Sequence, residues 1–159
     1  PIEIYEHPKT KFVANFIGET NLLDAVVLEV KGDKAVIGTE VGRAEVLINS
    51  DDDYSVNDGL SVSVRPEHMK FSRTPIEGFR IKGIVKENIF VGNLIKMMIT
   101  LNDGTEIRVN RFDASDLAQP GDLVYLYWDL NKGVVIKEKE LIHTDSTKDI
   151  EGGDPDEKE

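Results

Sequence analysis

The feature that most constrains the fold is a two-residue alternation of apolar and polar side chains along much of the chain. Leu60, Val62 and Val64 alternate with polar residues, and four apolar residues between 95 and 101 share one face. This period places apolar side chains on one side of a β-strand, whereas a helix requires a period of 3.6. The sequence Asn102-Asp103-Gly104 is a strong hairpin signal. The pattern predicts many short antiparallel strands, which is typical of small β-barrels.

The stretch Val64-Arg65-Pro66-Glu67-His68 divides the strand-rich region in two. Pro66 has no amide hydrogen to donate, so a strand that reaches it is expected to end there. The next candidate strand runs from Arg80 to Val91 and ends at Gly92-Asn93, where glycine permits a bulge or a tight bend. We therefore expect one β-rich domain over residues 21–137, built from halves of about 22–72 and 80–137.

Residues 1–20 have a different character. A short helical segment is predicted, because the apolar residues there fall on one helical face: Phe12, Val13, Phe16 and Ile17. A helix this short is marginal alone, so its apolar side chains must pack on something. They either dock on the β-rich domain that follows or belong to the edge of a preceding domain, and the residues alone leave both possibilities open.

Charge and composition narrow the functional classes. The chain has 159 residues, 40% of them hydrophobic, no cysteine and a formal net charge of −11. This charge argues against binding to a nucleic-acid backbone, where clustered Lys and Arg supply most of the affinity. Much of the acidity lies in residues 138–159, which are expected to form a disordered tail. The absence of cysteine suits a reducing compartment.

No catalytic or metal-binding constellation is recognisable in the sequence. The chain lacks the Gly-rich loop followed by Lys and Ser or Thr that cradles nucleotide phosphates. His7, His68 and His143 are too scattered to suggest a shared metal. The run of acids at 51–53 fails the calcium-loop template in both registers that we considered, because valine or aspartate occupies the position that requires glycine.

Two polar or aromatic groups are candidate sites. Tyr125, Tyr127 and Trp128 could stack bases, but no basic stripe adjoins them, so a core strand with one interface side is the preferred interpretation. Arg65 and Glu67 could hold a bend fixed by Pro66 through charge-assisted hydrogen bonds. The alternative is an ordinary surface turn whose ion pair contributes about 0–1 kcal/mol. Residue chemistry alone leaves these two interpretations equal.

Several stretches together resemble a known family. PIEIYEHPKTKFVANFIGETN resembles the segment that ends the nucleotide-binding domain in ATPase subunits of maltose-type and spermidine/putrescine-type ABC importers. VRPEH resembles the Arg-Pro-Glu signature of the transport-associated OB (TOBE) domain that follows. GIVKENIFVGNLIKMMITLNDGTEIRV and GDLVYLYWDLNKGVVI resemble its later strands, so the match runs from Pro1 to about Ile136. The sequences FIGETN and RPEH favour the spermidine/putrescine-type branch of this family.

The resemblance implies an OB-like TOBE barrel that acts as a cytoplasmic regulatory domain, peripheral to the inner face of the membrane. It implies a homodimer, contact with a nucleotide-binding domain through Phe12, Phe16 and Ile17, and a signature or regulatory interface at Arg65, Pro66, Glu67 and His68. Permease subunits and a periplasmic binding protein would be partners. ATP and Mg would bind only upstream of Pro1, with no catalytic residue, cofactor or metal in this chain. Alternatives are a TOBE module that binds an oxyanion or a polyamine and, with less support, an OB-type nucleic-acid binder.

Overall fold

The computed structural model describes residues 19–49 and 53–137, and these residues form a mainly β protein. The predicted helical segment with Phe12, Phe16 and Ile17 and the predicted acidic tail lie outside the described residues. The described strands are β1 (Asn21–Lys31), β2 (Lys34–Thr39), β3 (Gly42–Leu47), β4 (Gly59–Val64), β5 (Lys70–Ser72), β6 (Ile81–Val91), β7 (Leu94–Leu101), β8 (Glu106–Arg111), β9 (Leu123–Tyr127) and β10 (Val134–Lys137). Two short 3₁₀ turns, η1 (Ala114–Asp116) and η2 (Leu130–Lys132), connect some of them.

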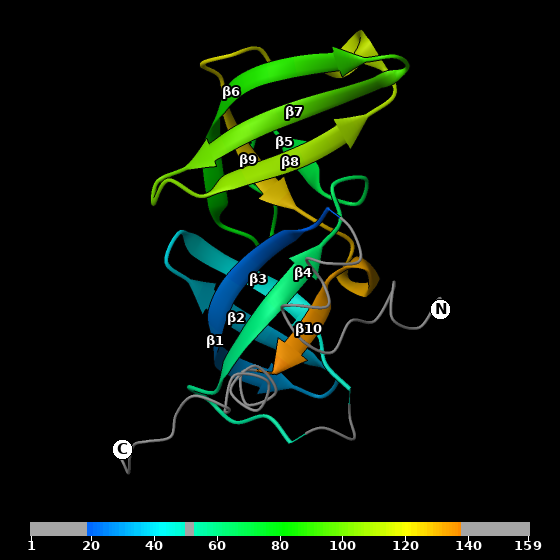
Figure 1. The fold of residues 1–159 in the computed structure, drawn as a ribbon. Helices are drawn as coiled ribbons and strands as arrows, with labels where there is room; N and C mark the ends of the chain where they lie inside the picture. The colour runs from blue at the N-terminus through cyan, green and yellow to red at the C-terminus, as the bar shows by residue number, and fades with distance from the viewer. Residues whose placement is uncertain (1–18, 50–52, 138–159) are drawn as a thin grey trace, which may run out of the picture.

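The strands form two five-stranded antiparallel sheets, one above the other in Figure 1. Sheet A has the order β10-β4-β1-β2-β3, and sheet B has the order β5-β9-β6-β7-β8. Sheet A curls until β10 contacts β3 at its opposite edge, but no ladder closes either sheet within the described residues. The mainly β prediction is confirmed, whereas the ladders give two open sheets rather than a closed barrel.

The sheets do not coincide with the two predicted halves of the sequence. Strand β5, which falls in the predicted first half, pairs with β9 in sheet B. Strand β10, which falls in the predicted second half, pairs with β4 in sheet A. The chain therefore passes from sheet A to sheet B after Val64 and returns after Tyr127. This difference arises because periodicity identifies a strand but not the strand with which it pairs.

Local structure follows the expected patterns closely. The alternating residues of β7 are buried at Ile95, Met97, Ile99 and Leu101. The predicted break at Gly92-Asn93 is a two-residue turn between β6 and β7, with Gly92 at φ 59°. The predicted hairpin at Asn102-Asp103-Gly104 joins β7 to β8, and Asp103 accepts a hydrogen bond from the Thr105 amide.

The aromatic strand predicted at 123–128 belongs to the core. Trp128 is 2% exposed, and its ring packs edge-on against Phe79 with centroids 5.0 Å apart. Edge-to-face pairs of this kind add roughly 0.5–1.5 kcal/mol beyond area burial. Tyr127 also packs edge-on against Phe79. The strand is therefore core on one side, as preferred from the sequence, and its largest ring is not available for stacking on bases.

Candidate functional site at the junction of the two sheets

The first passage between the sheets is the Arg65–His68 turn, between β4 and β5. The amides of His68 and Met69 both donate to the Arg65 carbonyl, at 2.9 and 3.0 Å. Pro66 is buried, while Glu67 is exposed. Arg65 Nε donates to Glu67 Oε2 at 3.0 Å, so the ion pair considered from the sequence is present. Its role as a signature or regulatory interface remains a prediction.

The environment of Glu67 favours its ionised form. Partial burial raises the pKa of Glu67, but hydrogen bonds from its own backbone amide and from Arg65, with the positive charges of Arg65 and His68, outweigh that effect. The pKa of Glu67 therefore lies below its ordinary value. Because the Arg65–Glu67 pair is partly solvent-exposed, it contributes only about 0–1 kcal/mol to stability.

The backbone of the same turn holds an edge of sheet B. The Pro66 carbonyl accepts a hydrogen bond from the Asn110 amide of β8 at 3.0 Å. Strand β8 is the edge strand of sheet B, and an unpaired edge exposes backbone groups that need partners. The turn thus connects the end of β4 in sheet A to β8 in sheet B through a main-chain contact.

Asn21 supplies the next contact along that edge. Its side-chain amide donates to the Arg108 carbonyl at 2.9 Å, and its Oδ1 accepts from the Arg108 amide at 2.8 Å. Asn21 is 2% exposed, so this contact is sheltered from water. One side chain from the start of β1 therefore pairs with β8 as a short piece of strand would.

Glu19 and Thr20 extend the junction on either side. Glu19 Oε2 lies 2.9 Å from Arg108 Nε, and its Oε1 lies 3.9 Å from Lys96 Nζ, so it contacts two strands of sheet B. Thr20 shares a 2.6 Å hydroxyl hydrogen bond with Ser63 in sheet A. Residues 19–21 and the Arg65–His68 turn, far apart in sequence, therefore both contact β8 at the boundary between the sheets.

A second boundary contact lies between β3 and the start of β6. The Arg80 amide donates to the Arg43 carbonyl at 2.8 Å. Gly42 has φ 143°, and a Cβ there would stand 2.0 Å from the Arg80 carbonyl oxygen. Only glycine allows the two backbones to approach so closely. The sheets are thus fixed to one another at two separate places.

The structure also contains junction residues that sequence reasoning missed. Arg65, Pro66, Glu67 and His68 were identified, but Glu19, Asn21, Arg108 and Gly42 were not. Asn21 had a detectable signal, because it continues the inward-facing series Leu23, Ala25 and Val27 as a buried polar residue. The partner of Asn21, by contrast, lies 87 residues away and leaves no local pattern.

An acid-lined groove of about 710 Å³ lies beside the junction. Its walls come from β1, the β2–β3 turn and the β7–β8 turn, and Figure 1 shows the last of these reaching from sheet B toward sheet A. The charged residues that line it are Asp24, Glu40 and Asp103, with apolar side chains such as Leu22 and Val41 between them. Hydrogen bonds from Thr105 lower the pKa of Asp103, which keeps that carboxylate ionised.

Within residues 19–49 and 53–137, no three potential metal ligands of the His, Cys, Asp and Glu types gather in one place. The same residues include no helix of the length and apolarity needed to cross a bilayer. His68 lies in the Arg65–His68 turn, and His7 and His143 fall outside the described residues.

The described residues thus form a mainly β domain of two five-stranded antiparallel sheets that are bonded to one another. Residues 62–136 match the family described as the TOBE domain, and this chain carries a TOBE domain. A solved structure of the cytoplasmic molybdate-binding protein ModG, with molybdate bound, has a similar fold. Its TM-score is 0.60 at 13% identity, and the match covers 74% of this chain and 95% of that one.

Curated proteins that are similar to this chain include spermidine/putrescine import ATP-binding proteins named PotA. The Acidothermus cellulolyticus protein is 31% identical over 152 residues, which cover 92% of this chain and 38% of the relative. The Thermobifida fusca protein is 37% identical over 133 residues, or 80% of this chain and 34% of the relative. This chain is therefore homologous to PotA proteins over most of its length but spans little more than a third of theirs.

Proposed function

We propose that this chain is the non-catalytic C-terminal regulatory and dimerisation domain of the ATP-binding subunit of an ABC importer for spermidine or putrescine. The similarity of 80–92% of the chain to PotA proteins carries this proposal. ATP and Mg bind in the domain upstream of Pro1, which Phe12, Phe16 and Ile17 contact. The subunit is cytoplasmic and associates with permease subunits, which a periplasmic binding protein supplies with substrate.

The junction supports a regulatory role for this domain. Two independent attachments, Asn21 with Arg108 and Arg43 with Arg80, hold the sheets in one orientation. A signal or partner that moves one sheet would therefore move the other with it, which is what a domain that reports its position to an attached ATPase requires.

A chimera tests this proposal. The corresponding C-terminal part of the Thermobifida fusca protein would be replaced by this chain, and spermidine uptake and ATP hydrolysis would be measured in the assembled transporter. We expect both activities to be retained, in contrast to a control that lacks any C-terminal domain. A chimera that folds and hydrolyses ATP without supporting uptake would contradict the assignment.

The acid-lined groove favours a second candidate function, the binding of a small polyamine. Asp24, Glu40 and Asp103 supply negative charge between apolar walls, which suits an alkyl chain that carries ammonium groups. The groove has no basic lining residue, so it favours a polycation over an oxyanion.

Calorimetry of the 159-residue chain tests the groove. We expect heat with spermidine and none with molybdate, and roughly tenfold weaker spermidine binding in Glu40→Gln/Asp103→Asn, because two attracting charges are removed. Glu77→Gln, an exposed acid that is not among the lining residues, is the matched control. Spermidine binding that the double variant leaves unchanged would exclude this groove as the site.

A further inference from the structure

The end of the β6–β7 hairpin is apolar and exposed. We use the term tip patch for Ile89, Phe90, Val91 and Phe112. Phe90 is 65% exposed, Val91 is 53% exposed, and Phe112, which follows β8, is 72% exposed. Single exposed apolar residues are ordinary, but several at one end of a hairpin mark a region that another molecule covers.

The tip patch has apolar side chains on both sides of the strand. Ile89 and Val91 share one side, whereas Phe90 lies opposite Ile95 and points to the other. Strand β9 pairs with β6 only as far as Ile84, so no strand of the described residues covers this end from that direction. Strand β6 therefore extends past its ladder with β9 toward the β6–β7 turn.

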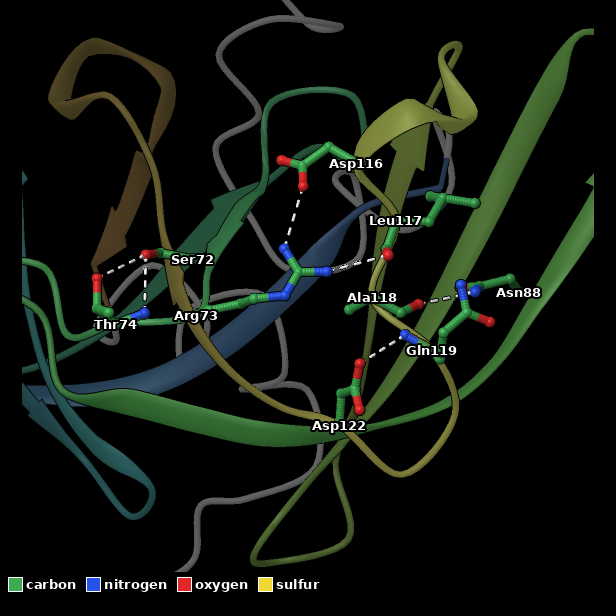
Figure 2. Close-up of polar contacts among 9 residues, drawn as sticks. All are labelled: Ser72, Arg73, Thr74, Asn88, Asp116, Leu117, Ala118, Gln119 and Asp122. Atoms are coloured by element: carbon green, nitrogen blue, oxygen red, sulfur yellow. Dashed lines mark hydrogen bonds and ion pairs between the residues drawn. The ribbon is translucent and has the colours of Figure 1, made fainter.

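The loop that carries Phe112 is held firmly against the sheet. Figure 2 shows Arg73 donating to Asp116 Oδ1 at 3.1 Å and to the Leu117 carbonyl at 3.0 Å. Asn88 Nδ2 donates to the Ala118 carbonyl at 2.9 Å. A surface whose loop is already ordered loses little conformational entropy when a partner binds. The loop beside the tip patch therefore needs little further ordering when a partner binds.

The distribution of charge identifies the kind of partner. Residues 19–69 contain four basic and eleven acidic residues, a net charge of −7, whereas residues 70–127 contain eight basic and seven acidic residues, a net charge of +1. Sheet B is therefore nearly neutral in a chain whose net charge is −11. Two copies that meet through sheet B keep their acidic sheets at the far ends, where screening weakens their repulsion.

The immediate border of the tip patch is also self-complementary. Glu87 and Asp113 lie two residues and one residue from the tip patch in sequence, Lys96 pairs with Ile89 and also lies 3.9 Å from Glu19, and Arg111 precedes Phe112. A two-fold contact places the same surface on both partners, so each base can meet an acid of the other copy. An anionic lipid surface would instead select an excess of basic residues.

The size of the tip patch fits a weak contact. A fully exposed phenylalanine offers about 200 Å², so the four side chains together leave roughly 400 Å² accessible. A standard stable interface buries about 800 Å² on each partner. The tip patch alone is therefore enough for a reversible contact that a second attachment, such as paired ATP-binding domains, would reinforce.

We propose that the tip patch is the surface through which two copies of this domain associate. This inference rests on the dimerisation part of the proposed function and assigns it to named residues. The association is isologous, with the two β6–β7 hairpins side by side and each Phe90 and Phe112 covered by the partner's tip.

Sedimentation equilibrium of the 159-residue chain tests the proposal. We expect a reversible dimer at concentrations up to about 1 mM. Phe90→Ser/Phe112→Ser is expected to raise its dissociation constant at least roughly tenfold, because two apolar anchors are lost. Val56→Ser, at a side chain that is 56% exposed and belongs to the other sheet's loops, is the matched control. Circular dichroism would establish that each variant is folded, and Phe112→Ser alone replaces the double variant if that one unfolds.

Three results would overturn the proposal. The first is a chain that remains monomeric at about 1 mM, and the second is equal weakening by the tip and control variants. The third is binding to anionic vesicles that requires both phenylalanines, which would assign the surface to lipid. None of these results depends on uptake by the chimera, so a failure here is distinguishable from a failure of the importer assignment.

Discussion

Replacing Gly42 by alanine is expected to lower the free energy of unfolding by about 3 kcal/mol. A Cβ at this position would lie 2.0 Å from the Arg80 carbonyl oxygen, which is backbone and cannot rotate away. The β3 and β6 backbones would have to separate, breaking the 2.8 Å hydrogen bond between Arg80 and Arg43. Urea denaturation followed by circular dichroism would measure the loss.

Gly32→Ala is the matched control for this substitution. Gly32 also has a positive φ, of 63°, but no atom stands within 4 Å of the Cβ that would be added. Its replacement should cost only the backbone-conformation penalty, about 1–2 kcal/mol. If both variants lose the same stability, the close approach of β3 to β6 is not what requires glycine at position 42.

Asn21→Ala is expected to cost about 3 kcal/mol, because it leaves the amide and carbonyl of Arg108 without the partners they have in β8. Denaturation would measure the total effect. Amide hydrogen exchange would locate it, since the Arg108 amide should also become exposed by local opening, whereas amides in the middle of sheet A should change only with the global loss of stability.

Asn131→Ala, at an exposed asparagine of η2, is the control and should change stability by less than about 0.5 kcal/mol. Asn21→Asp separates the two hydrogen bonds, because it keeps an acceptor for the Arg108 amide and loses the donor to the carbonyl. Unchanged exchange at Arg108 in Asn21→Ala would show that the side chain does not hold the edge of β8.

The individual strands and turns were largely predictable from the sequence. Alternation identified β4 and β7, and the glycine-containing turns identified both ends of β7. Pro66 correctly marked the end of a strand, since β4 stops at Val64. These features depend on neighbouring residues only, so a single chain segment contains the information needed to predict them.

The candidate site was only partly readable, because its remaining contacts are long-range. Pro66 and the family resemblance drew attention to residues 65–68, but their contact with Asn110 depends on how β8 is placed. The reason for glycine at position 42 is the position of Arg80, which only the folded chain defines. Strand β5 has three residues, too few for periodicity to assign it to a sheet.

The route of the chain also sets an order of events during synthesis. Strand β4 leaves the ribosome before all of sheet B, whereas β10, which covers its second edge, emerges after sheet B. One edge of β4 therefore remains unpaired while about 70 residues are translated. At typical elongation rates this interval lasts several seconds. An unpaired edge attracts other strands, so the nascent chain is most exposed to misassembly in this interval, and the addition of β10 ends it.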